Sequence, residues 1–185
     1  PFDGDLLDRG PNGHHGSAIG APAYVAGVRG SALDFDGVDD LLRVPGVPNA
    51  TWDTAWTASW FMRADDLRRY SLLSKRSNCT VSQLIDVRLA STAPELVGFE
   101  LSNGTQTAVA RAPIAAGAWV HVAVVRDGGA ARVVVDGVAG ADVVAPSQNL
   151  AGVVAALAFG DSPCVGGADG TLRYAGSLDE LRIYD

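Results

Sequence analysis

Four aspartates stand close together in the stretch "LDFDGVDDLL", residues 33–42, with no lysine or arginine among them. They are Asp34, Asp36, Asp39 and Asp40. Such a group could hold a metal ion, supply catalytic acids, or form a charged turn. Because strand side chains alternate between faces, Asp34 and Asp36 should point away from the apolar residues between them, and the four carboxylates should not converge. The pattern favours a charged hairpin in which Asp40 accepts hydrogen bonds from loop amides, with a contribution to a calcium site as the alternative.

Composition limits the class of protein. The chain has 185 residues, 48% of them hydrophobic, which suits a single domain with a buried core. The formal net charge of −7 argues against nucleic acid and against an anionic membrane surface, since both attract basic patches. The sequence has no run of 18 apolar residues, so we expect no membrane insertion. The first and last segments, "PFDGD" and "LRIYD", lead us to expect a module of a larger secreted protein.

The two cysteines, Cys79 and Cys164, both stand in polar sequence contexts. They could form a disulfide or remain as two free thiols. Because exposed thiols are a chemical liability, we expect the disulfide, which implies an oxidising compartment. In the chain-entropy model, a bridge across so long a loop stabilises the fold by about 4–5 kcal/mol.

Short strand-like runs recur along the chain with turn signals between them. In "QLIDVRLA", Asp86 and Arg88 alternate with apolar residues, as on a strand with one wet face. Asp-Gly, which suits tight hairpins, occurs five times, most clearly in "HVAVVRDGGAARVVVDG". A single helical turn is expected near residues 64–70. Many strands and almost no helix favour an all-β, two-sheet antiparallel sandwich.

Several segments, in order, resemble a known family. "LLDRGPNGHHG", "GSALDFDGVDDLLRVP", "WTASWFMRA", "AGAWVHVAVVRDGGAARVVVDGV" and "YAGSLDELRIYD" resemble laminin-G-like jelly rolls of the concanavalin A-like lectin and glucanase superfamily. The resemblance implies two curved antiparallel sheets, an extracellular setting and a bound calcium ion, often in modules that bind sugars. "YSLLSKRSN" and "FGDSPCVGG" bear a weaker resemblance to two ligand-binding loops of pentraxins.

The segment "DRGPNGHHG" is the candidate calcium loop. Calcium takes six to eight oxygen ligands, and this loop offers the Asp8 carboxylate and carbonyls from the turn at Asn12 and Gly13. The resemblance implies that Asp179, on the last strand, is a partner. Asp179 alternates in step with Leu181 and Ile183, so we expect it to point inward, where a carboxylate needs a counter-charge. A structural aspartate that caps backbone amides is the alternative.

The two cysteine-bearing loops form the candidate ligand site. The residues expected to bind the ligand are Arg76, Asn78, Asp161, Asp169 and Tyr174. A disulfide would preorganise both loops at one rim of the sandwich, as a ligand site requires. Asn78 and Asp161 could bind sugar hydroxyls or a second calcium ion, and Tyr174 could stack on a sugar ring. The alternative is that the disulfide only holds the two loops together and no ligand binds there. The concave sheet is the other candidate location for ligand binding.

Catalytic patterns are absent from the sequence. A retaining glycosidase needs two carboxylates about 5–5.5 Å apart, and we expect none of the three glutamates to share an inward face with a second acid. Trp60 and Trp119 are expected to pack in the core or at a strand edge, whereas Trp52, in a loop, is the freest to meet a sugar. The histidines lack zinc spacing.

Together these features predict a non-catalytic recognition module, secreted or at the cell surface. Its expected ligand is a glycan or a cell-surface glycoconjugate, with calcium as the cofactor. The alternative is a structural or protein-interaction module of the cell-adhesion type that binds no sugar.

Overall fold

The computed structural model describes residues 2–80, 82–90 and 96–185, and almost all of its regular structure is β. We name the two sheets A and B. Sheet A contains β1 (Ser17–Ile19), β4 (Leu41–Val44), β14 (Leu157–Phe159), β6 (Tyr70–Lys75), β7 (Gln83–Ala90), β8 (Leu96–Asn103), β9 (Thr107–Pro113) and β15 (Leu172–Arg173). Sheet B contains β12 (Val138–Ala139), β11 (Ala130–Val135), β10 (Val120–Asp127), β5 (Trp56–Ala64), β16 (Ala175–Tyr184), β3 (Ser31–Asp36), β2 (Ala23–Ala26) and β13 (Val143–Val144).

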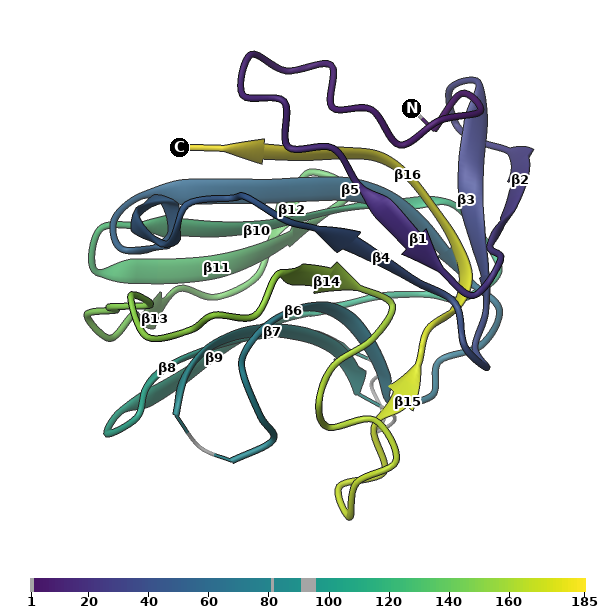
Figure 1. Ribbon diagram of the computed structural model, residues 1–185. Coiled ribbons are helices and arrows are strands. Elements are labelled where there is room, and N and C mark those ends of the chain that lie inside the picture. The colour runs from purple at the N-terminus through teal and green to yellow at the C-terminus, as the bar shows by residue number, and fades with distance from the viewer. Residues whose placement is uncertain (1, 81, 91–95) are drawn as a thin grey trace.

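The strand order confirms the predicted sandwich. Sheet A runs β1-β4-β14-β6-β7-β8-β9, and sheet B runs β12-β11-β10-β5-β16-β3-β2. The recorded pairs are antiparallel except for β15, which runs parallel to β6. Figure 1 shows the two sheets as facing layers, with sheet A arched so that its outer face is concave. This is the two-sheet jelly roll expected from the sequence.

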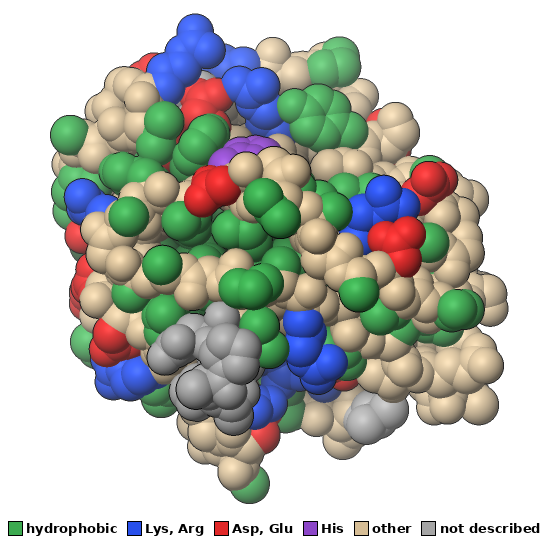
Figure 2. Space-filling model, turned by 180° about the vertical axis from the view of Figure 1, so that it is seen from behind, with side chains coloured by type: hydrophobic (Ala, Val, Ile, Leu, Met, Phe, Trp, Pro, Cys, Tyr) green, Lys and Arg blue, Asp and Glu red, His purple; other side chains and the backbone are tan. Residues whose placement is uncertain are grey.

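Alternation along the strands fills the space between the sheets. Ile85, Val87 and Leu89 of β7 face Trp56 and Trp60 of β5 across a continuous cluster of buried apolar side chains. Both indole rings make edge-to-face contacts, Trp56 with Phe99 at 5.4 Å between centroids. Such contacts suit aromatic side chains whose N–H groups are buried. Charged side chains are thereby left to the outer faces and the rims, and Figure 2 shows them on the molecule as seen from behind, with hydrophobic side chains gathered between them.

Two Asp-Gly sequences form the turns predicted for them. Asp127 pairs with Ala130, so Gly128 and Gly129 alone connect β10 to β11. Asp136 (φ 48°) and Gly137 (φ 80°) connect β11 to β12 in the same way. Positive φ at both central positions is the geometry of a type I′ turn, which residues 136 and 137 adopt, whereas in the first hairpin only Gly128 has a positive φ, of 54°.

The helical turn expected at residues 64–70 is wrong. Ala64 ends β5 and Tyr70 begins β6, and between them the Asp66 carboxylate accepts a hydrogen bond from the Arg68 amide at 3.1 Å. This local bond favours a turn over a helix. Among the described residues the helical turn is instead a 3₁₀ turn at Asn49–Trp52.

Candidate functional site

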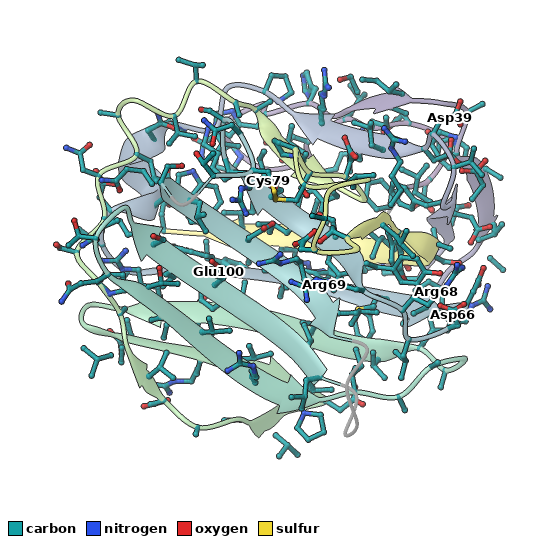
Figure 3. The ribbon with its side chains drawn as sticks, turned by 90° about the horizontal axis from the view of Figure 1, so that it is seen from below. Asp39, Asp66, Arg68, Arg69, Cys79 and Glu100 are labelled. Carbon is teal, nitrogen blue, oxygen red and sulfur yellow. A yellow bond between two sulfur atoms is a disulfide. The ribbon has the colours of Figure 1, made fainter. Side chains whose placement is uncertain are left out.

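The concave outer face of sheet A carries a row of polar side chains. Ser74 of β6 lies opposite Asp86 of β7, which lies opposite Glu100 of β8. Their strand neighbours, such as Val87 and Phe99, point into the core, so alternation turns this row outward. Figure 3 looks onto this face and shows Glu100 and Arg69 near its centre, with Cys79 to one side.

Two arginines neutralise the acids of this row. Arg76 donates to Asp86 at 2.8 Å, and both side chains are almost fully buried. Arg88 pairs with Glu100, contacts Asp86 at 3.6 Å, and contacts Asp169 of the loop after β14 at 3.0 Å. Because a buried carboxylate is costly unless it is paired, Arg76 and Arg88 are what allow Asp86 to lie on this face.

Asp86 has the most strongly perturbed acidity on this face. Burial raises the pKa of Asp86 to about 6, against the lowering effect of Arg88 and Arg76. Desolvation disfavours the charged form of a carboxyl group, which is why burial acts in this direction. Near pH 6 this network therefore exists with Asp86 in both protonation states.

Several buried polar atoms on this face have no hydrogen-bond partner in the structure. They are Ser71 Oγ, Ser74 Oγ, Arg69 Nε and Asp86 Oδ1. Ser71 and Ser74 are the cross-strand neighbours of Arg88 and Asp86, so these atoms belong to one region. Buried donors and acceptors are nearly always satisfied, so these four atoms are exceptions, although their burial keeps them out of direct reach of a ligand.

A disulfide joins the two loops beside this face, as predicted. Cys79 and Cys164 are bonded, with Cα atoms 4.8 Å apart. Arg76 also stabilises the loop that carries Cys79, because it donates to the backbone carbonyls of Asn78 at 2.8 Å and Thr80 at 3.1 Å. The same guanidinium thus connects the disulfide loop to Asp86. In Figure 1 the loop between β14 and β15 descends beside the concave face.

The predicted loop residues take different roles. Asn78 uses its side-chain oxygen to accept a bond from the Thr80 amide at 3.0 Å. Asp161 lies 3.2 Å from Arg173. Asp169 is the residue that reaches the concave face, through Arg88 at 3.0 Å and Arg69 at 3.4 Å. Arg76 lies beneath the face as a structural cation.

Two aromatic predictions are wrong. Tyr174, proposed to stack on a sugar, is fully buried between Phe35 and Tyr70, and its hydroxyl donates to the Ser177 carbonyl at 3.2 Å. Trp52, proposed as the freest tryptophan, is also fully buried, against Trp56. Both lie just outside regular core strands in the sequence, yet the sandwich closes over them.

The expectation about the glutamates concerned inward faces, and the pair of acids that the structure shows is on the outer face. Glu100 lies directly opposite Asp86 on the concave face. The alternation in "QLIDVRLA" already placed Asp86 and Arg88 on one face, but the pairing with β8 depends on a register that the sequence does not state. Arg69 carried no sequence signal, because it precedes β6 by one residue and acts through the loop of Asp169.

The Asp8 loop is satisfied by its own backbone. Asp8 accepts hydrogen bonds from the amides of Gly10 at 2.7 Å and His14 at 2.8 Å. The Gly10 bond contributes most to holding the pKa of Asp8 below its usual value. Asn12 is exposed, and Gly13 adopts a positive φ of 65°. Asp8 and Asn12 line a groove of about 760 Å³ that also includes Leu181–Asp185.

Asp179 lies on the other side of a bulge from the residues expected to share its face. β16 advances three residues from Asp179 to Arg182 while β5 advances two from Phe61 to Ser59. The extra residue reverses the alternation, so Asp179 does not face the core with Leu181 and Ile183. It is fully buried on the outer side, as shown by its pairing opposite Phe61.

Two backbone amides satisfy Asp179. Arg29 donates to Oδ2 at 2.9 Å and Glu180 donates to Oδ1 at 2.7 Å. Asp8 and Asp179 therefore fasten different loops and share no recorded partner. The calcium role of Asp8, Asn12, Gly13 and Asp179 stays a prediction.

Three of the four acids in "LDFDGVDDLL" do come together. One carboxylate oxygen from each of Asp36, Asp39 and Asp40 lies within 4.8 Å of the others, because the turn at Gly37 (φ 75°) brings the chain back. The expectation that they diverge is wrong for these three. The expected role of Asp40 is confirmed, since it accepts bonds from the amides of Ala21 at 2.7 Å and Asp36 at 3.1 Å.

These features define a jelly roll with a polar concave face, and the comparisons agree with that class. A family model described as the concanavalin A-like lectin/glucanases superfamily, Laminin_G_3, matches residues 36–185. The chain belongs to this family. A search of curated protein sequences found no match. No helix in the described ranges has the length and apolar character that crossing a membrane requires.

Solved structures support the fold over the whole chain. Domain 4 of AbnA, an extracellular GH43 arabinanase from Geobacillus stearothermophilus solved with arabinotriose, is 22% identical with a TM-score of 0.73, over 100% of this chain and 89% of that one. The binding domain of botulinum neurotoxin serotype D/C is 12% identical (TM-score 0.69), over 96% and 45%. Mouse laminin α1 domains LG4-5 are 16% identical (TM-score 0.64), over 89% and 43%.

Proposed function

We propose that this chain is a non-catalytic extracellular module that recognises carbohydrate on the concave face of sheet A. The observation that carries the proposal is the partly exposed ion-pair network of Arg88, Glu100 and Asp169 on this face, which the buried pair of Arg76 and Asp86 supports from beneath. Sugar hydroxyls both donate and accept hydrogen bonds, so one hydroxylated ligand can serve carboxylate oxygens and guanidinium groups together.

The exposed part of the network has the chemistry for this task. Arg88 and Glu100 are 17% and 19% exposed, and Asp169 is 33% exposed, so each presents part of its side chain to a ligand. Arg88 is held from three sides by Asp86, Glu100 and Asp169, which fixes its position before a ligand arrives. Preorganised polar groups of this kind lower the entropy cost of binding.

The similar structures add support of a limited kind. The arabinanase domain was solved with arabinotriose, and its likeness to this chain spans almost the full length of both. At 22% identity the likeness concerns the fold. It supports a carbohydrate ligand as a class, and the disulfide supports an extracellular setting.

A hydrolase is the second candidate, because Asp86 and Glu100 are cross-strand neighbours on a concave face. Two features favour binding over cleavage. Asp86 is fully buried, and Arg88 contacts both carboxylates, so neither is free to transfer a proton to a bound sugar. A general acid must come within hydrogen-bond reach of the substrate.

A glycan array with the wild-type chain tests the proposal. We expect hits that Glu100→Ala reduces at least fivefold in affinity and that the control Asp142→Asn, in the connection between β12 and β13 of sheet B, leaves unchanged. A blank array with folded protein would favour the adhesion-type alternative. Release of reducing sugar from an array hit, abolished by Glu100→Gln, would establish the hydrolase instead.

A calcium role is also part of the proposal, and a thermal-shift titration with calcium tests it. If the ion binds near the predicted loop, Asp8→Ala removes the calcium-dependent rise in Tm. If it binds at the 36–40 turn, Asp39→Ala removes it. No rise in the wild type at millimolar calcium, the loosest range for extracellular modules, overturns the calcium role.

A further inference from the structure

The concave face has a local charge that differs from that of the whole chain. Its described arginines are Arg43, Arg69, Arg76, Arg88, Arg111 and Arg173, and its described acids are Asp86, Glu100, Asp161 and Asp169. Six cations against four carboxylates give a formal balance of +2 for this set, whereas the chain carries −7 and the acidic turn at residues 36–40 lies beside Arg173 at the edge of the face. A local field of this sign favours an anionic ligand, even on an acidic protein.

Two of these arginines converge on one carboxylate. Asp169 Oδ2 lies 3.0 Å from Arg88 Nη1 and 3.4 Å from Arg69 Nη2, although Asp169 is 81 and 100 positions away from them in the sequence. Arg88 comes from β7, and Arg69 comes from the turn before β6. A pair of guanidinium groups around one carboxylate is an arrangement that binds carboxylates in general.

The carboxylate that fills this clamp is displaceable. Asp169 is one-third exposed. Its loop is folded by its own hydrogen bonds, such as Gly167 to Cys164 at 2.9 Å and Gly170 to Gly167 at 3.1 Å, and is tied down by the disulfide. Moving the Asp169 side chain breaks no strand pairing, but it breaks the two hydrogen bonds that the carboxylate accepts from the Thr171 amide at 3.1 Å and the Thr171 hydroxyl at 2.9 Å. Partly exposed ion pairs contribute little stability, so an incoming carboxylate meets a modest barrier.

Outside Arg69, Arg88 and Asp169, the concave face offers a ligand charged and polar groups but no aromatic ring. The described outward side chains on β4, β14, β6, β7, β8 and β9 include no aromatic ring on which a sugar could stack. Arg43 and Arg111 flank the clamp on β4 and β9 with no carboxylate within ion-pair distance among the described residues. Charge and hydrogen bonding must therefore supply the affinity.

We propose that Arg69 and Arg88 form a binding site for the carboxylate of an acidic, uronate-containing glycan, and that Asp169 occupies this site in the free protein as an internal competitor. This inference rests on the proposed carbohydrate-binding function and names its ligand class. It also assigns Asp169 a role opposite to the one expected from the sequence, where it was a ligand-binding residue. Removing its charge should strengthen binding.

Isothermal titration with trigalacturonic acid and with the neutral trisaccharide arabinotriose tests this assignment. At 50 mM NaCl we expect wild type to prefer the uronate, and the preference to shrink at 500 mM because salt screens the ion pairs. Asp169→Asn should strengthen uronate binding about fivefold, since an exposed ion pair is worth up to ~1 kcal/mol, and leave arabinotriose binding unchanged. Arg69→Gln should weaken uronate binding.

Matched variants separate the outcomes. Asp142→Asn removes another exposed aspartate, which precedes β13 and pairs with Arg132 of sheet B, and should change neither affinity. Circular dichroism and a thiol assay establish that Asp169→Asn keeps its fold and its disulfide. Weaker or unchanged uronate binding by folded Asp169→Asn overturns the competitor role. Binding of arabinotriose but not the uronate overturns the inference and leaves the proposed function standing, whereas binding of neither sugar, together with a blank array, overturns both.

Discussion

The outer faces of the two sheets use buried charge in opposite ways. On sheet A, Asp86 is buried among arginines and still has an oxygen without a hydrogen bond. On sheet B, Asp179 is equally buried, but two backbone amides satisfy its two oxygens. An aspartate whose oxygens are saturated by its own backbone is fully explained by folding. An aspartate held by arginines lies beneath the face whose partly exposed charges, Arg88, Glu100 and Asp169, a ligand can meet.

The same contrast extends to the aromatic side chains. Sheet B carries Phe61 and His121 with ring centroids 4.9 Å apart, and Arg63 over the Trp119 ring at 5.3 Å. These side chains pack against one another. The expectation that Trp119 packs in the core or at a strand edge is confirmed for the edge, because Trp119 directly precedes β10 and its ring lies half-buried under Arg63. The outer face of sheet A presents polar groups to a ligand, whereas these side chains of sheet B contact one another.

Removing the disulfide at the rim of sheet A should have the largest effect on the free energy of unfolding. Replacing Cys79 and Cys164 together by serine should lower the free energy of unfolding by about 4–5 kcal/mol, because the bridge closes a loop of 85 residues. Urea unfolding of the oxidised wild type and the double variant measures this. Reduced wild type should match the variant. A loss below about 1 kcal/mol would show that the rim is ordered without the bridge.

The second-largest effect is expected from the buried ion pair of sheet A, whose loss should cost more unfolding free energy than the loss of an exposed pair beside sheet B. Arg76→Met leaves Asp86 buried without its closest cation and should cost about 3 kcal/mol. Arg132→Met removes an exposed pair with Asp142 and should cost about 0.5 kcal/mol. Urea unfolding at pH 7.5 compares the two. Equal losses would break the contrast between the faces.

The stability of the protein should depend on pH through Asp86 of sheet A. Because burial raises the pKa of Asp86 to about 6, the folded state binds a proton more tightly than the unfolded state. The contribution of Asp86 to stability should therefore grow as the pH falls through about 6, and it is complete below the unfolded pKa, about 3.9. From pH 7.5 to pH 5, wild type should gain about 1 kcal/mol relative to Asp86→Asn. The opposite slope would mean that Arg76 and Arg88 outweigh burial.

The smallest effect is expected on sheet B. Arg63→Met removes a partly exposed cation–π contact with Trp119 and should cost about 0.5 kcal/mol. It should leave glycan affinity unchanged. Loss of glycan binding in Arg63→Met or Trp119→Ala, with Glu100→Ala unaffected, would move the ligand site from sheet A to sheet B.

The site was only partly predictable for identifiable reasons. Local patterns found Asp169 and the cysteine loops, because those residues stand in polar loops. They missed the partnership of Asp86 with Glu100 and of Arg69 with Asp169, since cross-strand register and loop closure join distant residues. Asp179 was misplaced because one inserted residue reverses every following side chain, and a bulge leaves no mark in the alternation.

Period-two alternation, Asp-Gly turns and paired polar cysteines were enough to determine the sandwich, its hairpins and its bridge. These depend on residues close in sequence or on a simple choice between two states. Which carboxylates face an arginine and which face an amide was decided only when both sheets were folded. That outcome depends on register and burial, because the cost of a buried charge is set by neighbours that lie far away along the chain.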